Sequence, residues 1–71
     1  MNRQRLLQAT WNESIRSLPR NRVEHMLQEI GFSRSMYRHL KDEELRKLLF
    51  GFMTRLDEET LEDMIQYVKS T

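Results

Sequence analysis

Two histidine–glutamate pairs are the residues of this chain whose types and spacing could hold a metal ion. His25 and Glu29 lie four residues apart, as do His39 and Glu43, so each pair shares one face of a helix. A zinc site needs three or four ligands and a second shell of hydrogen bonds, and neither pair has a third candidate beside it. We therefore interpret both pairs as solvent-facing and expect no metal and no cofactor.

Ser35 and His39 have the spacing of a serine nucleophile and its general base, because they also lie one helical turn apart. No acidic residue except Glu43 is placed to orient the histidine, and no glycine-rich loop precedes a helix to hold a phosphate. The chain has no cysteine, which excludes a disulfide framework and a thiolate metal site. The sequence therefore predicts a protein that is not an enzyme and has no small-molecule substrate.

The distribution of arginine is the most informative feature of the charged residues. Residues 1–40 carry seven arginines, no lysine and three glutamates, which gives a net charge of +4. Residues 41–71 carry five basic and eight acidic side chains, a net charge of −3, so the total of +1 conceals a dipolar chain. Arginine forms bidentate hydrogen bonds with carboxylates and phosphates, and the first part of the chain is therefore suited to an acidic partner.

Apolar side chains recur every three or four positions along most of the chain, which is the period of an amphipathic helix. The clearest example is the helix face shared by Val23, Met26, Leu27 and Ile30. The sequence predicts an all-α fold, a compact orthogonal bundle of four to five short helices in a single domain spanning residues 1–71. The expected helices cover about 3–17, 19–30, 34–40, 43–55 and 58–69.

A few residues mark where these helices are expected to begin and end. Pro19 fits the first turn of the second helix, with Ser17 as its preferred cap. Gly31 suits the left-handed position that ends that helix. Ser33 and Asp57 are expected to cap the third and fifth helices through their side-chain oxygens. The inner face of the third helix is expected to consist of Met36, Tyr37 and Leu40.

Composition excludes several classes of protein. A hydrophobic content of 38% with a net charge of +1 is unlike that of disordered chains. No run approaches the ~18 apolar residues of a membrane span, and no secretory signal is visible, so we expect a cytoplasmic protein that does not bind membranes. A core of this size rarely supplies more than about 3–5 kcal/mol without a disulfide or a metal, so we expect a homodimer.

Three interpretations of the arginine-rich first part remain open. In the first, its arginines pair with the acidic second part inside the same fold. In the second, which we favour, an arginine-bearing face and an exposed apolar patch bind another, acidic protein, as in a regulatory or adaptor module. The residues expected at that surface are Arg16, Arg20, Arg22, Arg34, Arg38 and Phe50. Leu6 and Tyr67 are further apolar side chains at the edge of the expected core.

The third interpretation is nucleic-acid binding. In residues 23–40, an apolar residue precedes Gly31, and Ser33 then opens a short helix rich in polar and basic side chains. This stretch resembles the helix-turn-helix unit of bacterial regulators and recombinases. The resemblance implies a DNA-binding transcriptional regulator whose second helix meets the major groove. The residues that it would place against DNA are Arg34, Ser35, Arg38 and His39.

Overall fold

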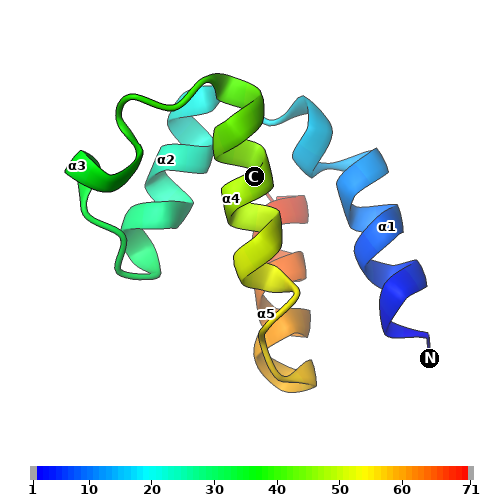
Figure 1. The fold of residues 1–71 in the computed structure, drawn as a ribbon. Coiled ribbons are helices and arrows are strands. Elements are labelled where there is room, and N and C mark those ends of the chain that lie inside the picture. The colour runs from blue at the N-terminus through cyan, green and yellow to red at the C-terminus, as the bar shows by residue number, and fades with distance from the viewer. Residues whose placement is uncertain (1, 71) are drawn as a thin grey trace.

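The computed structural model describes residues 2–70, which form helices joined by short turns (Figure 1). The elements are α1 (Arg3–Glu13), the 3-10 turn η1 (Ile15–Ser17), α2 (Arg20–Glu29), α3 (Arg34–Tyr37), α4 (Asp42–Met53) and α5 (Glu58–Ser70). The described residues contain no strand, and the predicted all-α bundle is confirmed. Its radius of gyration of 11.5 Å is close to the ~11 Å expected of a compact chain of this length.

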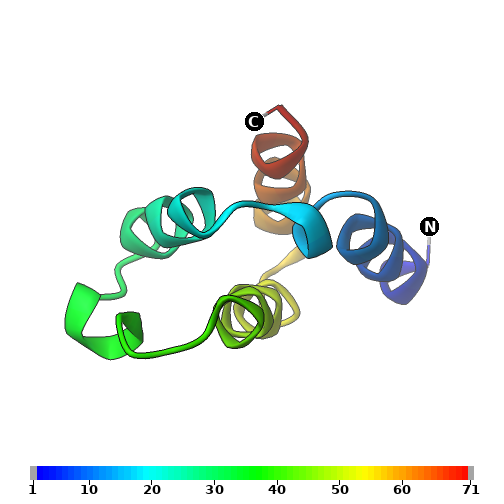
Figure 2. The ribbon, with the colours of Figure 1, turned by 90° about the horizontal axis from the view of Figure 1, so that it is seen from above.

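The four longer helices lie nearly side by side. In Figure 1, α1 and α5 run in one direction and α2 and α4 in the other, and Figure 2 shows these helices closer to end-on than to side-on. The short links join neighbouring helices that run in opposite directions, within the all-α bundle that the sequence predicts. The one-turn helix α3 lies beside α2 at one end of the molecule, and α1 lies at the other end (Figures 1 and 2).

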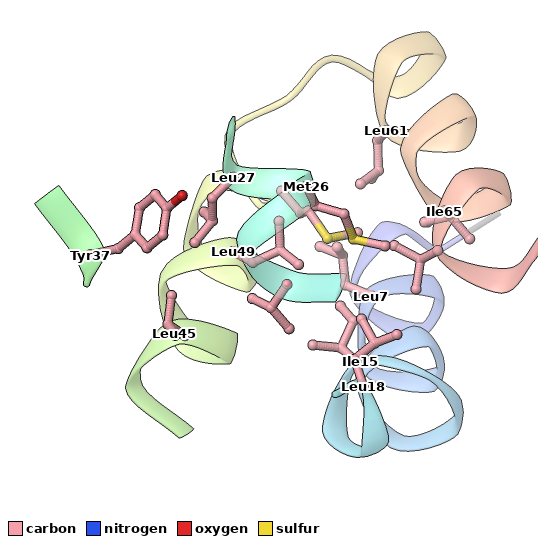
Figure 3. Close-up of a cluster of buried hydrophobic side chains, with 13 residues drawn as sticks. Leu7, Ile15, Leu18, Met26, Leu27, Tyr37, Leu45, Leu49, Leu61 and Ile65 are labelled. Carbon is pink, nitrogen blue, oxygen red and sulfur yellow. The ribbon is translucent and has the colours of Figure 1, made fainter. Parts of the chain in front are cut away.

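A single cluster of buried apolar side chains contains residues from all five α-helices and from η1 (Figure 3). Burying one leucine completely contributes about 1.5–3 kcal/mol, so the three fully buried core positions of α4 matter greatly for a chain this small. Two edge-to-face ring pairs extend this core outward, namely Trp11 with Phe50 at 5.2 Å and Phe32 with Phe52 at 5.9 Å between centroids. The cluster consists of Leu7, Ile15, Leu18, Val23, Met26, Leu27, Tyr37, Leu45, Leu49, Met53, Leu61, Ile65 and Val68.

Two helices end at least three residues before the positions that the sequence predicts. The first was expected to reach residue 17, but α1 ends at Glu13 because Ser14 leaves the helical region, with φ −131° and ψ −60°. The turn that follows brings Ile15 and Leu18 into the core. The third was expected to reach residue 40, but α3 ends at Tyr37, and Lys41 is extended with ψ 161°. The third and fourth helices are therefore separate.

The ends of the helices agree only in part with the expected caps. Gly31 has φ 105°, as predicted for the residue that ends α2, and the Thr60 N–H donates to Oδ1 of Asp57 at 3.1 Å, as predicted for α5. Ser17 does not cap α2, because Pro19 occupies the N-cap position and no side chain bonds there. Ser33 occupies the N-cap position of α3, but its hydroxyl makes no capping bond.

The orientation of α3 also differs from the prediction at one residue. Tyr37 is fully buried, and Leu40 is partly buried, as expected for the inner face. Met36 was expected on the same face, but its side chain is 55% exposed. A single helical turn has no period long enough to show which of its apolar residues faces the core.

Candidate functional site

Within residues 2–70, Arg20 is the one arginine of the predicted binding surface whose side chain is bound to other parts of the chain. Its guanidinium donates to the carboxylates of Glu24 and Asp42, both at 2.9 Å, and to the carbonyl oxygens of Leu40 at 2.7 Å and Arg38 at 3.2 Å. The hydrogen bond to Asp42, followed by that to Glu24, raises the pKa of the Arg20 guanidinium, although partial burial opposes the shift. Arg20 thus fastens the start of α2 to the link between α3 and α4.

Two further arginines have structural contacts that sequence analysis missed. Arg3 donates to the carbonyl oxygens of Thr54 and Leu56, which lie just beyond the end of α4. Arg46 donates from Nε and Nη2 to the carbonyl oxygen of Leu18, at 3.0 and 2.8 Å. A cation satisfies free carbonyl groups in this way at chain turns and helix ends. No local pattern indicates such contacts, because each partner is far away in sequence.

The remaining arginines of the predicted surface are exposed. Within residues 2–70, the side chains of Arg16, Arg22, Arg34 and Arg38 make no hydrogen bond or ion pair, and neither does that of Arg5. In the same residues, the ion pair between Arg20 and Asp42 is the only one that joins the basic first part to the acidic second part. The first interpretation, internal pairing of the two parts, therefore does not account for the arginines.

Two exposed arginines form what we call the α3 surface, namely Arg34 in α3 and Arg38, the residue that follows its end. They lie one turn apart, because the Arg38 N–H donates to the Arg34 carbonyl at 2.9 Å. Tyr37 holds this turn in place, since its ring is fully buried and its hydroxyl accepts a hydrogen bond from Gln28 Nε2 at 2.8 Å. Met36 is exposed as well, but it lies two positions from each arginine and therefore projects from the opposite side of the turn. The α3 surface thus consists of two unpaired cations on an anchored element.

Phe50 does not lie with these arginines. Its ring is partly buried against Trp11 of α1, and it lines a groove of about 650 Å³ between α1 and α4 together with Arg5 and Gln8. Because α1 and α3 lie at opposite ends of the molecule (Figure 2), the single surface predicted from the sequence is divided into two separate regions.

A second groove, which we call the α2–α5 groove, lies between the end of α2 and the middle of α5. Its volume is about 250 Å³, and its apolar wall is formed by Met26, Ile30, Met64 and Tyr67. Tyr67 is 40% exposed, as its position at the edge of the helix pattern indicated. The carboxylates of Glu29 and Asp63 line the same groove, and no arginine or lysine does. Sequence analysis missed this groove, because Glu29 and Asp63 come from distant segments.

The residues considered for metal binding and catalysis are not brought together. His25 Nε2 lies 3.6 Å from Glu29 Oε1, but both side chains are largely exposed, and no group of three metal-ligating side chains occurs in residues 2–70. The Ser35 hydroxyl pairs with that of Ser33 at 3.2 Å. Ser35, Arg38 and His39 are all exposed at α3, where the helix-turn-helix resemblance would require them.

No family model, curated protein or solved structure gives a significant match to this chain. Within the described residues, none of the helices has the length and apolar character needed to cross a bilayer. The surfaces of the chain itself are therefore the basis of its proposed function.

Proposed function

We propose that this chain is a small, non-enzymatic regulatory or adaptor module, expected in the cytoplasm, that binds an acidic partner protein through its α3 surface. The observation that supports this proposal is the pair of exposed, unpaired arginines, Arg34 and Arg38, which lie one helical turn apart. Arginine is enriched at protein interfaces, and a guanidinium binds a carboxylate with two parallel hydrogen bonds.

The contacts that hold α3 in place also favour binding, because an element that is already ordered loses less conformational entropy when a partner docks. Tyr37 anchors the turn from the inside through its buried ring and its hydrogen bond to Gln28. Arg20 holds the end of the turn through the carbonyl oxygen of Arg38. Both arginine backbones are thus fixed, and only the arginine side chains lose freedom in the complex.

The experiment compares the proteins that the chain captures from a lysate of its host with those captured by charge-reversed variants. We expect a stoichiometric partner to be retained by the wild-type chain and lost by Arg34→Glu and Arg38→Glu. Arg5→Glu is the matched control, because Arg5 is equally unpaired but lies on α1 at the other end of the molecule. Circular dichroism verifies the fold of each variant. Capture that is equal in all four proteins would contradict the proposal.

DNA binding is the second candidate function, and one observation favours it. Arg34, Ser35, Arg38 and His39, the residues that the helix-turn-helix resemblance would place against DNA, are all exposed at α3. A recognition element of one turn is only ~6 Å long, so few of its side chains would reach bases. A gel-shift assay at low salt tests this candidate: binding should weaken steeply as salt rises and should decrease in Arg34→Ala. Absence of binding to any duplex would exclude it.

A further inference from the structure

The α2–α5 groove has the properties of a site for a basic guest. The carboxylate of Asp63 makes no hydrogen bond or ion pair within residues 2–70, and that of Glu29 contacts only the exposed side chain of His25. No basic side chain lines the groove, so both carboxylates are available to an incoming cation. The wall of the groove is apolar, which favours a guest whose charges stand at the ends of apolar stems.

The α3 surface of the same chain has the complementary composition. Arg34 and Arg38 each carry a guanidinium at the end of an apolar methylene stem, which can lie along an apolar surface while the charge contacts a carboxylate. These arginines lie one helical turn apart, with ~5–6 Å between their Cβ atoms. They can therefore contact two carboxylates on either side of a narrow apolar groove.

We propose that the α2–α5 groove binds the α3 surface of a second copy of this chain. Arg34 and Arg38 of one copy lie across the groove of the other, with their apolar stems on Ile30, Met64 and Tyr67. Arg34 then pairs with Glu29, and Arg38 pairs with Asp63. α3 lies beside α2, which forms one wall of the groove (Figures 1 and 2), so both surfaces share the α2 end of the molecule. The closed form of this contact is a pair in which each copy places its α3 surface on the groove of the other, so that the contact occurs twice.

This inference rests on the proposed function, because it assigns a second copy to the same α3 surface that we propose for the acidic partner. The second copy and the partner protein then compete, and self-association reduces the number of α3 surfaces that are free. The two proposals remain separable, because Asp63 and Glu29 take part in self-association and not in binding of the partner.

Sedimentation equilibrium of the purified chain and its charge-reversed variants tests the inference. We expect the wild-type chain to pass from monomer to dimer as its concentration rises. Asp63→Arg and Arg38→Glu should each weaken dimerisation at least tenfold, because each places like charges opposite one another in both contacts. Arg5→Glu is the control and should dimerise like the wild type.

An equimolar mixture of Asp63→Arg and Arg38→Glu gives the most specific readout. In the mixed pair, the arginine introduced at position 63 of one chain faces the glutamate introduced at position 38 of the other, and the second contact keeps its native charges. The mixture should therefore form dimers that neither variant forms alone. Asp63→Asn and Arg38→Gln provide milder changes, should a charge reversal disturb the fold, and each should weaken dimerisation in proportion to the lost contact.

Three outcomes would overturn the inference: a wild-type chain that stays monomeric at millimolar concentration, dimerisation that both reversals leave unchanged, or a mixture that remains monomeric. A monomeric wild type that still loses its captured partner in Arg38→Glu would leave the proposed function standing alone. Conversely, normal self-association with no captured partner would refute the proposed function and keep the contact between copies.

Discussion

Tyr37 determines the position of α3 although it is one residue in a helix of a single turn. Its ring is fully buried in the same cluster as Leu27 and Leu45 (Figure 3), and its hydroxyl accepts a hydrogen bond from Gln28 at 2.8 Å. A helix this short makes too few backbone hydrogen bonds to be stable by itself. The display of Arg34 and Arg38 therefore depends on the packing of one aromatic side chain.

The first prediction separates the two contributions of Tyr37. Tyr37→Ala should lower the free energy of unfolding by about 3–5 kcal/mol, because it removes a buried ring and leaves a cavity. Tyr37→Phe should cost about 1 kcal/mol, since it removes only the hydrogen bond with Gln28, whose amide can bind water instead. Urea unfolding of the three proteins measures both values. Equal costs would show that the hydroxyl, and not the ring, holds α3.

The second prediction compares how much Arg20 and Arg22 contribute to the stability of the fold. Both are arginines at the start of α2, but Arg20 bonds to two carboxylates and two carbonyl oxygens, whereas the side chain of Arg22 has no partner in the described residues. Thermal unfolding should show a clear fall in Tm for Arg20→Ala and almost none for Arg22→Ala, because exposed, unpaired side chains contribute little to stability. The reverse order would contradict the role of Arg20 as a link between elements.

At the scale of elements, the start of α5 is stabilised by charge. Hydrogen bonds from the Thr60 side chain and from its backbone N–H lower the pKa of Asp57, and the nearby Arg3 acts in the same direction, while burial opposes the shift. Glu58 and Glu59 add negative charge in the first turn, where the helix dipole favours it. The third prediction concerns the effect of pH on this cap.

Because the pKa of Asp57 is lower in the folded chain than in the unfolded chain, its ionised form stabilises the fold above about pH 4. This contribution should be lost as the pH falls through the folded-state pKa. Asp57→Asn keeps a side chain that caps helices well but does not titrate. The advantage of the wild type over Asp57→Asn, measured by urea unfolding from about pH 6 to about pH 2.5, should shrink toward the acidic end. A difference that is independent of pH would contradict the prediction.

The helices were predictable from the sequence because α2, α4 and α5 each repeat an apolar face over at least two turns. The end of α1 at Glu13 and the single turn of α3 were not, because short segments take their form from the core that they contact. The same limit applies to the candidate site. Arg20 and Arg22 look alike in the sequence, and only the fold shows that Arg20 is bonded to Asp42 and to the carbonyl oxygen of Leu40.

At the scale of the whole molecule, the basic first part and the acidic second part of the chain leave most of each other's charges unpaired within the described residues. The molecule measures 36 × 21 × 19 Å, with the unpaired arginines of α3 at one end of the bundle and the acidic groove between α2 and α5. One ion pair in the described residues connects the two parts of the chain, so most of this charge faces solvent. The proposed contact between copies depends on these unpaired charges of both signs.

The fourth prediction uses stability as a measure of association. Anything that binds only the folded chain raises its stability by mass action, so the Tm of the wild type should rise with protein concentration. The Tm of Asp63→Arg should stay constant over the same range of concentration. Differential scanning fluorimetry at low ionic strength measures both, and high salt should reduce the difference because the contact depends on charge. A wild-type Tm that does not change with concentration would argue against self-association.

The position of α1 at the end of the molecule opposite to α3 has a consequence for any closed pair. Association through α2, α3 and α5 leaves both copies of α1 on the outside, each with its groove lined by Arg5 and Phe50. The pair would then be bivalent, with two identical basic grooves held at a set distance. A partner with two suitably spaced acidic segments would bind it with an avidity that neither segment provides alone.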